Sequence, residues 1–166
     1  VALERYRWPE AERHFMAAIV WSFVGPEPAG RADIDATRLC GAALEQLGVL
    51  ARRRDRIADA VSLHARAHEL RARWGSPDEA WESALSAGID ARIGARWREA
   101  QRWFDKALHS ARRCREVPPK EAAVWANRAE AYIEEGKGAE AVEAARQACR
   151  CRQAFDQGSL ATAGGD

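Results

Sequence analysis

The chain has few lysines and no clear excess of either charge. Its 166 residues include 26 Lys and Arg against 25 Asp and Glu, which leaves a formal net charge of +1. The only lysines are Lys106, Lys120 and Lys137, a bias toward arginine that is typical of a GC-rich genome. Proteins dedicated to nucleic acid usually carry a basic excess, because phosphate contacts dominate their affinity. We therefore expect no nucleic-acid partner.

Long apolar runs are also missing. The longest candidate, Phe15 to Val24, is interrupted at Trp21-Ser22 and followed by Gly25-Pro26, whereas a membrane-spanning helix needs about 18 or more apolar residues. The N-terminal residues lack the apolar core of a cleavable signal peptide. We expect no membrane partner and a cytoplasmic location.

Patterns that carry chemistry are scarce. The four cysteines match no zinc-binding spacing, and we expect free thiols; they are Cys40, Cys114, Cys149 and Cys151. His64 and His68 are four residues apart, a spacing that suits a metal, but Ala65 stands where H-E-x-x-H hydrolases carry glutamate and no third ligand is evident. Phosphate loops, nucleophile elbows and paired carboxylates are absent at convincing spacing. We expect a protein that is not an enzyme, with no catalytic residues, metal or cofactor.

An internal repeat is the main positive signal. Residues 8–18 and 97–107 share the pattern W-x-E-A-x-R-x-F-x-x-A, and residues 57–67 and 138–148 are weaker copies. Alanines occupy the equivalent position in all four copies, about 40 residues apart after the first interval; they are Ala11, Ala60, Ala100 and Ala141. A second helix is predicted before each of the last three copies. Small residues recur in it at Gly48, Gly88 and Ala129, where two helix backbones are expected to approach closely.

These residues resemble the tetratricopeptide repeat, whose signature is W-x2-L-G-x2-Y followed by A-x3-F. Trp125, Ala129, Tyr132 and Ala141 match it in register, and earlier repeats match at Leu44, Leu47, Gly48, Ala60, Ala67, Gly88, Ala100, Phe104 and Ala107. The chain looks like a bacterial member, with a period near 40 instead of 34 and with Ala145 at a position that is usually aromatic. The resemblance implies an all-α fold, a right-handed α-α superhelix of about seven antiparallel helices.

Turn and capping signals divide the chain. Ser76-Pro77-Asp78-Glu79 predicts a helix start, Val117-Pro118-Pro119 predicts a break, and glycines separate the last two helices. The predicted helices are 8–23, 34–52, 56–74, 77–93, 96–115, 120–135 and 138–155. They form one domain, 1–156, with repeats at about 34–74, 77–115 and 120–155 and a flexible tail at 157–166.

In proteins of this family the first helix of each pair lines a concave groove that holds the ligand. The resemblance therefore implies a groove of mixed charge around an apolar strip. Its residues are Glu45, Val49, Arg52, Arg53, Glu82, Leu85, Ile89, Arg92, Ile93, Asn127, Glu130, Ile133 and Glu134. The arginines would lie on one side of the strip, and Glu130 and Glu134 on the other. We expect an extended or helical peptide with apolar anchors, whose acidic groups meet the basic end.

Residues 8–23 resemble only the second helix of a pair, so their apolar face has no first helix to cover it. Either the connection 23–34 or the next repeat covers this face, or it packs against a second copy or another segment. The residues of such a self-association face are Phe15, Ile19, Trp21 and Phe23. The leading hypothesis is a protein-interaction scaffold. The alternatives are a self-association module, with a homodimer through this helix, and a regulatory or sensor domain of a larger signalling or transcription-regulating protein.

Overall fold

The computed structural model describes residues 31–163 of the chain. Within this range the secondary structure is helical, without strands, so the prediction of an all-α fold is confirmed there. The helices are α2 (Arg31–Arg53), α3 (Ile57–Trp74), α4 (Pro77–Ile93), α5 (Trp97–Ala111), α6 (Val117–Glu134) and α7 (Gly138–Ala163). The expected helix at 8–23 lies outside the described residues.

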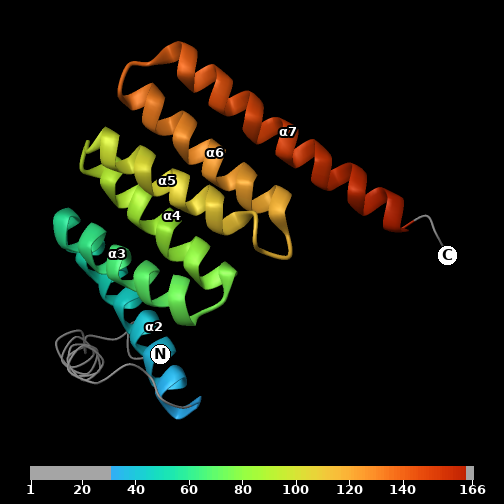
Figure 1. Ribbon diagram of the computed structural model, residues 1–166. Coiled ribbons are helices and arrows are strands. Elements are labelled where there is room, and N and C mark those ends of the chain that lie inside the picture. Colours follow the sequence, from blue (N-terminus) through green and yellow to red (C-terminus); the bar gives the residue numbers. More distant parts are fainter. Residues whose placement is uncertain (1–30, 164–166) are drawn as a thin grey trace.

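Consecutive helices run antiparallel and lie side by side in chain order, from α2 at one end of the row to α7 at the other (Figure 1). The pairs α2/α3, α4/α5 and α6/α7 are helical hairpins. Neighbouring hairpins meet where α3 packs on α4 and where α5 packs on α6, and α4 also touches α6. The last helix, α7, continues past the end of α6 (Figure 1).

The helix boundaries follow local chemistry. Ser76 caps α4, because its hydroxyl accepts a hydrogen bond from the backbone N–H of Glu79 while the Glu79 carboxylate accepts one from the N–H of Ser76. The predicted break at Val117-Pro118-Pro119 is wrong, since α6 begins at Val117 with the prolines in its first turn. Proline fits there because the first N–H groups of a helix have no intrahelical partner.

The C-terminal ends of α5 and α7 also differ from the prediction. Helix α5 ends at Ala111 and not near residue 115, and the chain reaches α6 through a connection that contains the buried Cys114. Helix α7 continues to Ala163, past both the predicted helix end at 155 and the start of the predicted tail at 157.

All three turns inside the hairpins are closed in the same way. Asp55, Ala95 and Gly136 adopt positive φ values of 59°, 53° and 81°. The residue after each donates its N–H to a carbonyl five positions back, as in Arg96 N–H to Ala91 O at 2.8 Å. This is the Schellman ending, which satisfies the last carbonyls of a helix. The same turn recurs at residues 55, 95 and 136, so the sequence period of about 40 residues corresponds to one helical hairpin.

In each of the first two hairpins, a glycine lets the two helices approach closely. A Cβ built on Gly48 would lie 2.7 Å or less from three atoms of the His64 ring, and one built on Gly88 would lie 2.6 Å from Cε1 of Phe104. Both rings are fully buried. The core around Phe104 consists largely of alanines, including Ala84, Ala100 and Ala107, which lets the helix axes approach closely.

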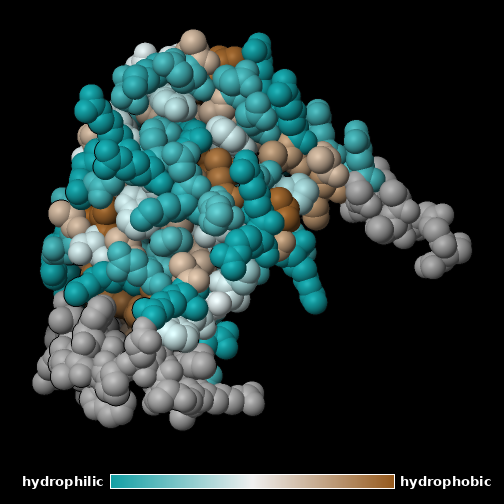
Figure 2. All heavy atoms as spheres, viewed as in Figure 1, coloured by the Kyte–Doolittle hydropathy of each residue, from teal (hydrophilic) through white to brown (hydrophobic). Residues whose placement is uncertain are grey.

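One face of the described part is mainly polar. The face seen in Figure 2 is mostly hydrophilic, with small and separate apolar areas. None of the described helices combines the length and the apolar character that a bilayer crossing requires.

Candidate functional site

Two exposed isoleucines mark one face of the stack. Ile93 in the last turn of α4 is 49% exposed, and Ile133 near the end of α6 is 66% exposed. Large apolar side chains are normally withdrawn from water, so two on neighbouring helices are a candidate contact surface. We call this surface the Ile93–Ile133 face; it comprises Ile93, Glu130, Ile133 and Glu134.

Arg92 joins the two halves of the Ile93–Ile133 face. Its guanidinium contacts the carboxylate of Glu130 at 3.1 Å and also pairs with Glu134. These bonds place the end of α4 beside the end of α6. The prediction that Arg92 lies across the strip from Glu130 and Glu134 is therefore wrong. The guanidinium is largely buried while the two carboxylates are about half-exposed, so the face presents an acidic surface to solvent.

Behind this face, α4 contributes partly buried apolar side chains. Leu85 and Ile89 pack against the core around Phe104. On α6, the side-chain amide of Asn127 donates to the carbonyl of Ala123, one turn earlier in the same helix. Of the predicted strip residues, Leu85 and Ile89 are thus partly covered by the core, whereas Asn127 is bonded within its own helix.

The other predicted groove residues are divided between surface and interior. Arg53 and Glu82 are exposed, and Val49 is half-buried. Glu45, by contrast, is only 5% exposed. The prediction that Glu45 lines a groove is wrong, because its side chain points between helices instead of toward solvent.

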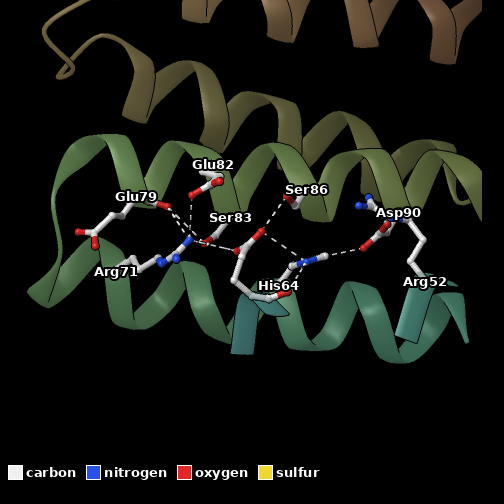
Figure 3. A network of polar contacts seen from close by, with 9 residues as sticks. Arg52, His64, Arg71, Glu79, Glu82, Ser83, Ser86 and Asp90 are labelled. Carbon is white, nitrogen blue, oxygen red and sulfur yellow. Dashed lines mark hydrogen bonds and ion pairs between the residues drawn. The ribbon is translucent and has the colours of Figure 1, made fainter. Parts of the chain in front are cut away.

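Glu45 belongs to a polar network buried between α2, α3 and α4 (Figure 3). Its carboxylate accepts hydrogen bonds from Ser83 Oγ at 2.7 Å, Ser86 Oγ at 2.9 Å and Arg71 at 3.2 Å. Arg71 also donates to Ser83 Oγ at 2.8 Å. A buried carboxylate needs such partners to compensate for lost hydration, so these bonds fix α2 against both α3 and α4.

His64 and Asp90 occupy the other half of the network. Nδ1 of His64 lies 2.6 Å from the carboxylate of Asp90, and both side chains are fully buried. Nε2 faces the backbone oxygen of Glu45 at 3.2 Å. Both ring nitrogens therefore face oxygens that only accept hydrogen bonds, so the ring is held between α2 and α4.

Arg52 completes this half of the network and closes it toward solvent. Its guanidinium donates to the Asp90 carboxylate at 2.9 Å. In Figure 3, Arg52 and Asp90 lie at one end of the row of polar side chains and Arg71 and Glu79 at the other. Arg52 was predicted to present its charge to a ligand. The structure instead engages that charge with a fully buried carboxylate.

The network holds the residue types of a hydrolytic site, but not its connections. Ser83 Oγ bonds to Glu45 and Arg71, and neither Ser83 nor Ser86 is hydrogen-bonded to His64. His64, Ser83 and Asp90 are all 0% exposed. A nucleophile must share a hydrogen bond with its base and meet the substrate. This arrangement does neither, so we interpret it as a structural element that orders three helices.

The histidine pair does not converge on one point. His68 Nδ1 donates to the carbonyl of Ala80 at 3.0 Å, and its ring packs edge-on against Trp103, while His64 faces Asp90. Within residues 31–163 no cluster of three or more His, Cys, Asp or Glu side chains is placed to hold a metal ion. The predicted self-association residues Phe15, Ile19, Trp21 and Phe23 lie outside the described residues.

Sequence reasoning missed the network because its members are spread over three helices. One signal was available: His64 stands at the position that Phe104 occupies one repeat later. A histidine in place of a core ring calls for polar partners, and Asp90 is the acidic residue whose flanking positions on α4 are apolar. Neither feature alone specifies that the two side chains meet.

Comparison with known proteins adds no assignment: no protein-family model matches the chain, and no curated protein matches it either.

Proposed function

We propose that the chain is a protein-interaction scaffold whose Ile93–Ile133 face binds a peptide segment of another protein. The observation that carries the proposal is the exposure of Ile93 and Ile133, at 49% and 66%, on adjoining ends of α4 and α6. Fully burying an exposed apolar side chain of this size is worth about 1.5–3 kcal/mol, and each of these partly exposed isoleucines contributes a corresponding share. Two such anchors are enough to select a short segment of moderate affinity.

The helix arrangement supports a scaffold of the tetratricopeptide kind. Its hairpins follow one another along the chain, and Gly48 and Gly88 make equivalent close contacts with a ring. Stacked hairpins of that family coil into a right-handed superhelix whose first helices line the concave side. On that proposal α2, α4 and α6 line the binding side, and the Ile93–Ile133 face lies at the C-terminal ends of α4 and α6.

The charges on the face favour basic groups in the peptide. Glu130 and Glu134 together carry two negative charges against the single positive charge of Arg92. Arg52 is engaged with Asp90 and adds no free charge toward a ligand. The expected ligand is therefore an apolar segment with lysine or arginine beside its anchors. This reverses the preference for acidic groups that the arginines alone had indicated.

Selection from a displayed random peptide library tests the proposal. The recovered peptides should be enriched in Leu, Ile or Val next to Lys or Arg. The double variant Ile93→Ser/Ile133→Ser should bind a synthetic copy of a recovered peptide at least tenfold more weakly in calorimetry. Glu130→Lys/Glu134→Lys should also weaken peptide binding. The loss should be larger at low salt than at high salt, since salt screens exposed charges.

Val142 and Glu143 provide matched controls, because both are exposed and both lie on α7. Val142→Ser and Glu143→Lys should change the dissociation constant less than twofold. Unchanged binding by the double isoleucine variant, or an acidic consensus among the selected peptides, would exclude the Ile93–Ile133 face as the binding site.

A further inference from the structure

A cavity of about 250 Å³ lies where the C-terminal ends of α3 and α5 meet the start of α4. One wall comes from α3 through His68, Arg71 and residues of the turn that follows. The other comes from the end of α5, through Lys106, His109 and Ser110, and from Arg113 just after it. The spacing of the α5 residues is that of one helix face, so their side chains point to the same side.

The lining is one-sided in charge. Three cations and two histidines surround the cavity, and no aspartate or glutamate lines it. The whole chain has 26 basic and 25 acidic residues, so this asymmetry does not follow from composition. Clustered positive groups in a concave site attract anions more strongly than the same groups spread over a surface.

The cations contributed from the α5 side are free to meet a ligand. Among the described residues, Lys106 and Arg113 form no ion pair. The ammonium of Lys106 instead lies 3.9 Å from the centroid of the Trp103 ring, which holds it beside the cavity. Arg71 differs, because it is buried and already bonded to Glu45 and Ser83. The carboxylates of Glu45 and Glu82 compensate its charge, so Lys106 and Arg113 provide the open donors.

His68 lines this cavity beside the charge of Lys106. Burial lowers the pKa of His68, the hydrogen bond to the Ala80 carbonyl raises it, and the nearby charge of Lys106 lowers it. An anion between His68 and Lys106 would relieve this repulsion. Ser76 and Ser110 also line the cavity, and their hydroxyls add neutral hydrogen-bond donors.

We propose that this cavity is a binding site for a small phosphorylated ligand, with Lys106 and Arg113 as the residues that contact its phosphoryl group. A phosphate monoester carries up to two negative charges and three acceptor oxygens, which suits two free cations and two hydroxyls. The volume is below the range of about 300–1,000 Å³ that is usual for drug-sized ligands. The ligand is therefore small, such as a free phosphate ester or one phosphorylated side chain.

Titration followed by amide NMR at constant ionic strength tests the site, with inorganic phosphate as the first probe. Saturable shifts are expected at the amides of Ser76, Ala80 and Ser110. Lys106→Gln/Arg113→Gln should weaken phosphate binding at least tenfold. Arg98→Gln/Arg102→Gln removes the same charge from exposed positions of α5 that do not line the cavity, and it should change binding less than twofold.

Further probes separate the ligand classes. O-phospho-L-serine should bind more tightly than inorganic phosphate, because the cavity has room for an organic group, and a phosphoserine peptide distinguishes a side-chain ligand from a free ester. Acetate that binds as tightly as phosphate would overturn the phosphoryl assignment. Equal losses in the two double variants, or shifts that never saturate, would overturn the site itself.

Discussion

Gly48 lies directly against the buried ring of His64, so closely that a single added carbon would overlap three ring atoms. The same relationship recurs between Gly88 and Phe104, 40 residues later in both members. In the third hairpin the two equivalent positions hold Ala129 and Ala145, so neither a glycine nor a ring stands there. In the first two hairpins, a glycine on the first helix thus makes room for a buried ring on the second.

Gly48→Ala should destabilise the protein even though alanine is the better helix former. The gain in helix propensity is about 1 kcal/mol. Forcing a methyl group into the His64 ring costs about 1–3 kcal/mol and disturbs the hydrogen bond to Asp90. We expect a net loss in the free energy of unfolding, measured in urea. Gly138→Ala is the control, since a Cβ there meets nothing within 4 Å, and it should be neutral or stabilising.

Ala95→Gly should stabilise the turn between α4 and α5. Ala95 has a φ of 53°, and a side chain in this left-handed region costs about 1–2 kcal/mol. Glycine removes the strain but adds freedom to the unfolded chain, so we expect a net gain of about 0.5–1 kcal/mol. Thermal unfolding measures it as a rise in Tm.

The reverse substitution, Gly136→Ala, tests the same explanation. Gly136 has a φ of 81° and open space around it, so only backbone strain opposes a side chain there. It should lower the free energy of unfolding by about 1 kcal/mol. A gain in stability from Gly136→Ala would show that the left-handed geometry does not govern these turns.

Asp90→Asn should be among the most damaging conservative changes. It removes the charge that both His64 and Arg52 face, and the Asp90 side chain is fully buried. Breaking a buried ion pair from one side costs about 3–5 kcal/mol. Asp59→Asn is the matched control, because Asp59 pairs with Arg56 at the surface and should lose no more than about 1 kcal/mol. Similar losses in the two variants would contradict a structural role for the network.

Glu79 gives the α4 cap a dependence on pH. The backbone N–H of Ser76 holds the pKa of Glu79 below its ordinary value of 4.5, with further lowering from the Ser76 hydroxyl and Arg38 and an opposing effect of burial. A lowered pKa contributes stability that is present above pH 4.5 and is lost as the pH falls through the folded-state value. Wild type and Glu79→Gln should therefore converge in unfolding free energy at low pH.

Ser76→Ala separates the neutral half of this cap from the charged half. It removes the hydroxyl that accepts the N–H of Glu79, at a cost of about 0.5–2 kcal/mol. Part of that cost should persist at low pH, because the serine does not titrate. If Ser76→Ala and Glu79→Gln show the same pH profile, the capping box is not the origin of the dependence.

Much of the helical order was predictable because its signals are local. The helix 77–93 was predicted with the bounds that the structure has, since cap, proline and acidic first turn are all within four residues of Ser76. The start of α6 differs from the prediction because Pro118 and Pro119 occupy the first turn of the helix and do not interrupt it. The period of about 40 residues also follows from sequence, through Ala60, Ala100 and Ala141.

The sequence by itself therefore determined the helices, their pairing in chain order and the small residues at which they meet. Only the tertiary structure decided which charges are available to a ligand. Glu45 and Arg52 look like surface residues of an amphipathic helix, but Arg71, Ser83 and Asp90 engage them from two other helices. Lys106 and Arg113 remain open beside a cavity that no single helix forms. Local patterns fix the helices because their bonds are local, whereas the charge pairs Arg71–Glu45 and Arg52–Asp90 join residues 26 and 38 positions apart.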